Sequence, residues 1–225
     1  MARNTDPLTH SAVVVYKYAW AFFYGVLRAD DCAVRALEEG VKIAEGSGDE
    51  YGLGVLKFSL GVALLCRDAA ADHQRGLELL IQVRDVYLRE GDYYTNPLLD
   101  LYVARENARR GDRDGAIPVI RKAVDDLHEA GRLGNGLCGA CILVETLLDR
   151  GTEGDVAEAQ AAIDRLANLP AAEGLAVRDI WLLRLRALLA RARSDDVVYR
   201  DLVERYRAMA ESLGFEGHID WADAM

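Results

Sequence analysis

The chain has 225 residues, 51% of them hydrophobic, so it is long enough to bury a substantial core and is not expected to be disordered. Its 27 basic and 37 acidic residues give a net charge of −10, which argues against a nucleic-acid surface because phosphate binding needs clustered lysine and arginine. Only four prolines occur, and leucine, alanine, arginine and the acidic residues dominate. This composition favours helix over strand, and we predict an all-α protein.

Apolar residues recur at helical spacing in segments that come in pairs, with short breaks marked by glycine, aspartate or asparagine. We predict about five antiparallel helix pairs and a short C-terminal cap. The predicted pairs are 9–27 with 30–45, 50–67 with 71–89, 96–110 with 113–129, 136–150 with 155–168, and 172–193 with 195–212, and the cap is 217–225.

The second helices of these pairs share a small residue followed four positions later by a large apolar one, as at Ala116 and Ile120. The same offsets recur at Ala33 with Leu37, Gly76 with Leu80, and Ala159 with Ile163. A small residue lets two antiparallel helices approach, and the larger residue fills the groove beside it. Helical pairs that recur about every 40 residues are typical of tetratricopeptide-type stacks. The sequence therefore predicts a right-handed tetratricopeptide-like superhelix that forms a single domain over residues 1–225.

Cysteine usage and the absence of a leader pattern point to the cytoplasm. The four cysteines lie in or next to predicted helices of a chain that needs no disulfide staples. They are Cys32, Cys66, Cys138 and Cys141. The only candidate membrane segment, 11–27, carries Lys17 near its centre, barely reaches spanning length, and has no basic leader or cleavage site. We expect a cytoplasmic protein with no membrane contact.

Two predicted helices, 13–27 and 180–190, are apolar on nearly every side, a pattern typical of a helix buried all round. Burial between neighbouring repeats explains this pattern for an interior helix. The first segment has no preceding repeat to cover it, so a second hypothesis is that Tyr16, Trp20 and Phe23 contact an upstream domain or a second copy of the chain in a homodimer.

Motifs that carry chemistry are weak in this chain. Residues 134–139 match GxGxxG but follow a predicted helix instead of a strand, so we interpret them as a glycine-rich loop between repeats. Cys138 and Cys141 form a lone CxxC, which a buried helical face explains. The aspartates of 112–115 resemble part of a calcium loop, yet Ala123 stands where a bidentate glutamate is needed. With no nucleophile, base and oxyanion donor assembled, we expect no enzymatic activity, no metal and no cofactor.

Arginines on predicted first helices are the stronger polar signal. Arg105 and Arg109 belong to the first helix of the third pair, and Arg184 and Arg191 to that of the fifth. First helices line the concave surface of tetratricopeptide stacks, so these side chains are candidates to bind an acidic peptide or a small anion. The alternative is that they are solvated or paired within the chain, which has ten more acids than bases.

Four stretches resemble a known group of proteins: 206–225 (YRAMAESLGFEGHIDWADAM), 104–116 (ARENARRGDRDGA), 144–151 (VETLLDRG) and 178–191 (RDIWLLRLRALLAR). They are similar to the C-terminal helical-repeat region of large actinobacterial, especially mycobacterial, signalling proteins. Those proteins join a class III nucleotide cyclase domain to an AAA-type ATPase module. The resemblance covers most of the chain and rests on structural repeat segments, not on catalytic signatures.

The resemblance implies a regulatory or scaffolding tail, with cyclisation and ATP hydrolysis performed by domains outside this sequence. We therefore expect a nonenzymatic domain that mediates protein contacts, either with a protein partner or with its own upstream domains, and that regulates attached or associated cyclase and ATPase domains. The alternative is a sensor that binds a small-molecule inducer in the concave surface or in a pocket between repeats.

Overall fold

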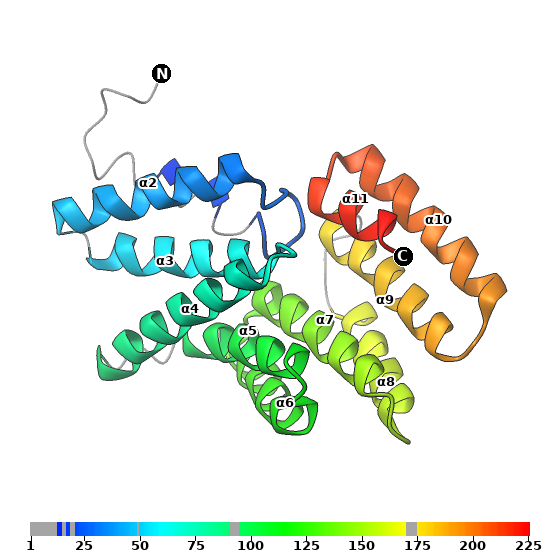
Figure 1. Cartoon of the computed structure of the whole chain (residues 1–225). Helices are drawn as coiled ribbons and strands as arrows, with labels where there is room; N and C mark the ends of the chain where they lie inside the picture. Colours follow the sequence, from blue (N-terminus) through cyan, green and yellow to red (C-terminus); the bar gives the residue numbers. More distant parts are fainter. Residues whose placement is uncertain (1–12, 15–16, 19–20, 49, 91–94, 170–174) are drawn as a thin grey trace. The chain divides into compact units, whose positions relative to one another are not determined.

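The computed structural model describes residues 13–14, 17–18, 21–48, 50–90, 95–169 and 175–225. In these residues every regular element is a helix and no strand is present, which confirms the predicted all-α class. Figure 1 shows the helices along the chain. Their bounds are α2 Asp31–Ser47, α3 Glu50–Leu65, α4 Ala70–Glu90, α5 Asn96–Arg109, α6 Arg113–Glu129, α7 Leu133–Arg150, α8 Asp155–Ala167, α9 Ala176–Ala192, α10 Asp196–Leu213 and α11 Glu216–Asp223.

The helices fall into two compact units, which cover residues 1–99 and 100–225, and α5 spans the boundary. We describe each unit by itself, and the single superhelix over 1–225 stays a prediction. Among the described residues, no helix combines the length and the apolar character that crossing a bilayer demands.

Aspartate side chains start three of the second helices. Asp30 accepts a hydrogen bond from the backbone N–H of Ala33 at 2.7 Å, and Asp195 accepts one from Val198 at 3.1 Å. Asp112 does the same for Gly115 at 3.0 Å at the start of α6. Each bond satisfies an N–H group that the first helical turn leaves without a partner. These three helices therefore begin where the sequence places a capping aspartate.

A left-handed residue ends several helices and accounts for two differences from the predicted bounds. Residues 21–25 form a turn in which Gly25 has φ 65° and the N–H of Val26 donates to the carbonyl of Ala21 at 2.8 Å, so the helix predicted over 9–27 does not continue to Leu27. Gly131 has φ 67° and ends α6 in the same way. Because that turn is short, α7 begins at Leu133, and the predicted glycine-rich loop at 134–139 lies inside a helix.

In the unit that covers residues 1–99, α3 packs against both α2 and α4. Gly61 and Gly76 form the crossing of α3 and α4, where a Cβ atom on Gly76 would lie 2.8 Å from the carbonyl oxygen of Gly61. Leu80, fully buried, fills the adjacent groove. The predicted small residue and its large neighbour therefore occupy this crossing as the sequence pattern implies.

Aromatic side chains from the start of the chain complete this unit. Tyr18 and Phe22 stack with ring centroids 5.6 Å apart, and both are buried. The ring of Phe23 lies 5.1 Å from that of Phe58 on α3 and is 5% exposed. Phe23 is thus covered within its own chain, while Tyr16 and Trp20 lie outside the described residues. Association through this segment stays a prediction.

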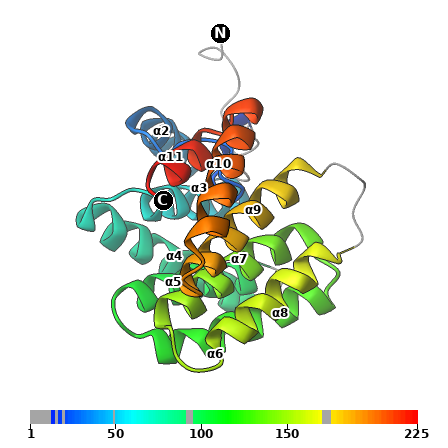
Figure 2. The same cartoon turned by 90° about the vertical axis from the view of Figure 1, so that its right-hand side faces the viewer.

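In the unit that covers residues 100–225, α7 packs against α6, α8 and α9, and α9 packs against α8 and α10. Figure 2 shows the α9–α10 pair with α11 beside it. Gly139 lets α7 come close to its neighbours, since a Cβ atom there would lie 2.9 Å from Val124 on α6 and 3.3 Å from Leu101 on α5. The first helices α5, α7 and α9 are thereby brought together, and this contact positions the candidate site.

One ion-pair arrangement occurs in both units. Arg67, just after α3, binds Asp72 at 2.6 Å and Asp31 at 2.7 Å. At the end of α7, Arg150 binds Asp155 at 2.6 Å and Asp114 at 3.0 Å. Each residue of the second set stands 83 positions after its counterpart in the first. The segment α6–α8 therefore repeats α2–α4 both in sequence position and in contacts.

Candidate functional site

Glu145 on α7 joins the other two first helices of the second unit through two arginines. Arg184 on α9 donates from Nη1 to one carboxylate oxygen, and Arg105 on α5 lies 3.3 Å from the other. The three residues are separated by 40 and 39 positions, which is one repeat each. Because successive first helices lie side by side, equivalent positions meet on one face. We call Arg105, Glu145 and Arg184 the arginine–glutamate cluster.

The electrostatics of this cluster keep Glu145 ionised. Burial favours the neutral acid, but the positive charges of Arg184 and Arg105 outweigh it and lower the pKa of Glu145, with a smaller contribution from Arg109. The side chains of Arg184, Arg105 and Glu145 remain 14%, 19% and 19% exposed. The charges are therefore anchored but still reach the surface.

Aromatic rings hold Arg184 in place. Its guanidinium carbon lies 5.4 Å from the ring centroid of Trp181 and 5.2 Å from that of Trp221 on α11, distances at which cation–π attraction operates. Nε of Arg184 and Nε1 of Trp181 are buried donors that have no hydrogen-bond acceptor among the described residues. The cluster thus holds more donors than its single carboxylate accepts.

A buried hydrogen bond supports the rings from behind. The hydroxyl oxygen of Tyr206 on α10 lies 2.7 Å from Nδ1 of His218 on α11, and both side chains are fully buried. Burial raises the pKa of the Tyr206 hydroxyl, so it stays protonated at neutral pH. His218 also packs edge-on against Trp181 and Trp221. The C-terminal helix α11 therefore positions the indoles around Arg184.

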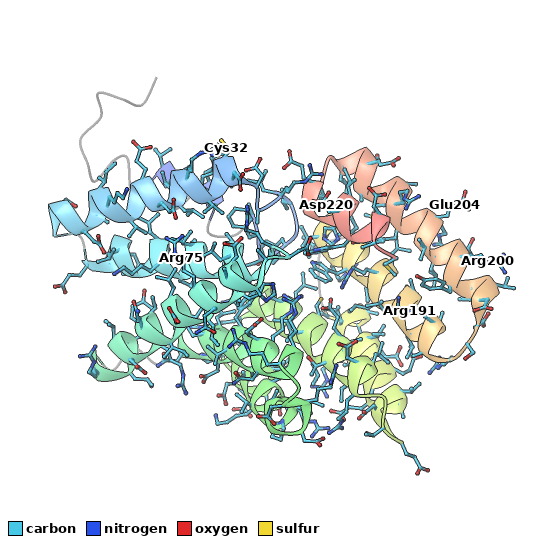
Figure 3. All side chains as sticks on the ribbon, in the orientation of Figure 1. Cys32, Arg75, Arg191, Arg200, Glu204 and Asp220 are labelled. Atoms are coloured by element: carbon cyan, nitrogen blue, oxygen red, sulfur yellow. The ribbon has the colours of Figure 1, made fainter. Side chains whose placement is uncertain are left out.

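The four predicted arginines do not form one group. Arg105 and Arg184 meet at Glu145. Arg109 is exposed, and its positive charge helps to lower the pKa of Glu145. Arg191, labelled in Figure 3 near the end of α9, is exposed, and its guanidinium carbon lies 5.9 Å from the ring of Tyr199. Arg105 and Arg184 are thus paired within the chain, the alternative that the acidic composition suggests.

Glu145, which joins Arg105 to Arg184, was not predicted as a site residue from the sequence. The sequence position of Glu145 could have indicated this pairing, because one repeat separates it from each of the two arginines. The aromatic support from Trp221 and His218 was also missed. Their helix was predicted as a cap, and periodicity alone does not say against which side chains a cap packs.

Cys138 and Cys141 lie on α7 beside the cluster. Both thiols are buried, which raises the pKa of Cys138 to about 12 and that of Cys141 well above its usual range. A protonated, buried thiol is a poor nucleophile, as expected for a packed helical face. No group of three or more His, Cys, Asp or Glu side chains in the described part of the chain is arranged to hold a metal ion.

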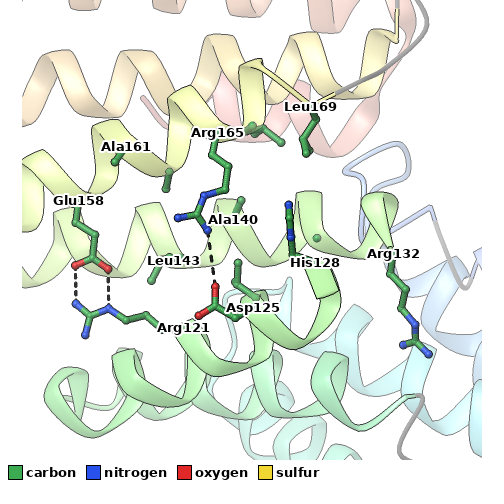
Figure 4. A pocket seen from close by; sticks show the side chains of 14 residues that line it. Arg121, Asp125, His128, Arg132, Ala140, Leu143, Glu158, Ala161, Arg165 and Leu169 are labelled. Carbon is green, nitrogen blue, oxygen red and sulfur yellow. Dashed lines mark hydrogen bonds and ion pairs between the residues drawn. The ribbon is translucent and has the colours of Figure 1, made fainter. Parts of the chain in front are cut away.

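A cavity of about 190 Å³ lies between α6, α7 and α8 (Figure 4). Its floor is formed by apolar or small side chains: Val124, Gly136, Ala140, Leu143, Ala161, Ala162, Leu166 and Leu169. Two ion pairs join α6 to α8 at its edge, Arg121 with Glu158 at 2.5 Å and Arg165 with Asp125 at 3.7 Å. A broader cavity of about 800 Å³ in the other unit is lined by α3 and α4 and includes Lys57 and Gln82.

No protein-family model, no curated protein and no solved structure matches this chain.

Proposed function

We propose that this chain is a nonenzymatic helical-repeat domain that binds an acidic segment of a protein partner on the face carrying Arg105, Glu145 and Arg184. The main support for this proposal is that the first helices α5, α7 and α9 bring charged side chains together at a spacing of one repeat. Helical-repeat proteins bind extended partners on surfaces of this kind, because neighbouring repeats continue one face.

Charge supports an acidic partner. The face carries the guanidinium groups of Arg105, Arg109 and Arg184 around one carboxylate, in a chain whose net charge is −10. Arginine recognises carboxylates through paired, charge-assisted hydrogen bonds. Glu145 and the indoles already fix Arg184, so less side-chain entropy remains to be lost on binding.

We also propose that partner occupancy is relayed to nucleotide cyclase or ATPase domains, either attached to this chain or associated with it, in the cytoplasm. This part rests on the resemblance of 206–225 and the three internal stretches to the helical-repeat region of such signalling proteins. Within the chain, the route for a signal is α11, which contacts α10 and whose Trp221 lies against Arg184.

Two matched double variants test the proposed face. Arg105→Gln with Arg109→Gln removes two positive charges from it, and Arg200→Gln with Arg205→Gln removes two from the exposed surface of α10. A partner recovered from a cytoplasmic lysate by the native chain is purified, and its affinity for each variant is measured by calorimetry. We expect the first variant to bind about tenfold more weakly and the second to bind like the native chain.

Equal affinity of both variants would contradict the proposed face, and equal losses in both would assign the effect to net charge alone. The proposal is also contradicted if the native chain and the first variant recover the same proteins from the lysate. Circular dichroism melting of each variant shows whether its fold is kept.

A second candidate function, sensing of a small molecule, is supported by the cavity between α6, α7 and α8. A thermal-shift screen addresses it, because a ligand that binds only the folded state raises the melting temperature.

A further inference from the structure

We infer that the cavity between α6, α7 and α8 binds a small aryl carboxylate, with its ring on the apolar floor and its carboxylate on Arg165. The inference rests on the second candidate function and names the ligand class that such a sensor takes. It is independent of the arginine–glutamate cluster.

The size and floor of the cavity fit one aromatic ring. Its volume is about 190 Å³. An apolar cavity of about 150 Å³ in another protein accepts benzene, so a ring with one substituent fits here. Val124 and Leu166 are buried at the floor, and Ala140 and Ala162 leave the space above it open. The cavity therefore favours an aromatic body over a long chain or a sugar.

The equivalent part of the other unit also holds a cavity, but different side chains line it. Lys57 stands 83 positions before Ala140, and its Nζ lies 3.2 Å from Glu45. Leu79 stands at the position of Ala162, and Gln82 at that of Arg165. The first unit thus places an ion pair, a larger side chain and an uncharged amide where the second has two alanines and an arginine.

The rim of the cavity offers Arg165 to an anion. Arg121 is fully engaged, because two of its nitrogens lie 2.6 and 2.5 Å from the carboxylate of Glu158. Arg165 extends from α8 toward Asp125 (Figure 4), but the pair is 3.7 Å long and its side chains are 61% and 65% exposed. An exposed pair of this length contributes little stability, so Arg165 exchanges it readily for a ligand carboxylate.

Two more basic side chains lie at the same end of the cavity. His128 and Arg132 line it beyond Asp125. Among the described lining residues, three arginines stand against the carboxylates of Asp125 and Glu158, and this excess of positive charge favours a carboxylate over a neutral or cationic group. The apolar side chains of the floor therefore favour an aromatic ring, and the arginines of the rim favour a carboxylate.

The test titrates three probes into the full chain: benzoate, benzyl alcohol and acetate. Binding is followed by the NMR signals of the Ala140 and Ala162 methyl groups. Benzoate should bind with a dissociation constant of about 1 mM or tighter, and acetate should not shift either signal. Ala162→Leu, which restores the residue of the first unit, should weaken benzoate binding by at least about tenfold by filling the floor.

Arg165→Gln, matched by Arg205→Gln on α10 as a control, separates the ring from the charge. It should weaken benzoate by about tenfold and leave benzyl alcohol unchanged, while the control leaves both unchanged. If benzyl alcohol binds the native chain as tightly as benzoate, the carboxylate assignment is overturned and the sensing function stands. If neither aromatic probe moves the two signals at about 10 mM, the inference is overturned, and the sensing function is then decided by the thermal-shift screen alone.

Discussion

Asp155 illustrates, at the scale of one residue, how a carboxylate is stabilised at a helix start. It is 2% exposed, accepts hydrogen bonds from Arg150 at 2.6 and 3.0 Å, and accepts two more from the backbone and hydroxyl of Thr152 at 2.8 and 2.7 Å. The hydrogen bond from Arg150 is the largest influence, and together these donors lower the pKa of Asp155 from 3.8 to about 2. The ionised form is therefore part of the folded state.

This shift predicts acid sensitivity. Because the folded pKa lies below the ordinary value, the stabilisation is present above about pH 4 and is lost as the pH falls toward about 2. Asp155→Asn should lower the free energy of unfolding at neutral pH by about 2 kcal/mol and flatten its pH dependence in that window. Denaturant unfolding at several pH values measures both effects. Asp164→Asn, an exposed site on the same helix, is the control, and an equal effect there would refute the role of Asp155.

At the scale of the element, the crossing of α3 and α4 depends on the absence of a side chain at Gly76. A Cβ atom there would lie 2.8 Å from a backbone oxygen, which cannot rotate away, and 3.1 Å from Cβ of Leu64. By contrast, Gly46 on α2 has no atom within 4 Å of the place a Cβ would take. The two positions separate helix propensity from packing, since both glycines are helical.

Gly76→Ala should lower the free energy of unfolding by about 1 to 3 kcal/mol, because the helices must separate to admit the methyl group. Gly46→Ala should raise it by about 0.5 to 1 kcal/mol through helix propensity alone. Thermal melts of the two variants give the comparison directly. Stabilisation by both substitutions would show that the helices do not approach closely at Gly76.

Helix ends give a second element-scale prediction. Ser194 is the only non-glycine residue with positive φ among the described residues, at 58°, and it ends α9 with the same hydrogen-bond pattern that Gly214 gives α10. Ser194→Gly should therefore stabilise the chain by about 1 kcal/mol, and Gly214→Ser should destabilise it by a similar amount. Paired melting curves test the opposite signs, and a change of the same sign in both would contradict the argument.

At the scale of the whole molecule, the two units repeat one construction plan. The triads of Arg67 and Arg150 join three helical segments at positions 83 residues apart. Arg67, just after α3, links the starts of α4 and α2. Arg150, at the end of α7, links the starts of α8 and α6 in the same way. These side chains therefore set the spacing between consecutive helices in both units.

The equivalence predicts equivalent costs. Arg67→Ala and Arg150→Ala should each lower the free energy of unfolding, because each leaves a carboxylate without its partner. They share no partner, so the double variant should show the sum of the two effects. Chemical denaturation of all three variants provides the measurement. If only one of the two substitutions lowered the free energy of unfolding, the two arginines would be equivalent in sequence position but not in their contribution to stability.

Helix bounds were predictable because they depend on neighbours in sequence. Asp112 caps α6, and α5, α6 and α8 begin at their predicted residues. The bounds differed where a left-handed glycine intervened, at Gly25 and Gly131, since a glycine in a helical pattern does not reveal the sign of its φ angle. Local chemistry therefore fixed most elements and left a few ends open.

The candidate site was only half predictable. Arg105 and Arg184 stood out as arginines on first helices, but nothing local marks Glu145 as the partner of both. The pairing arises because α5, α7 and α9 lie side by side, which brings residues 40 and 39 positions apart into contact. Similarly, no local pattern marks Ala140 on α7 and Ala162 on α8 as lining one cavity.

The sequence by itself determined that the protein is helical, where most helices begin, and which small residues permit close crossings, because these properties follow from spacing and local propensity. The tertiary structure alone decided which charges pair, which rings surround Arg184, and where a cavity opens. The physical reason is that contacts between residues far apart in sequence depend on how helices are placed against one another, and helical periodicity specifies a face but not the side chain that meets it.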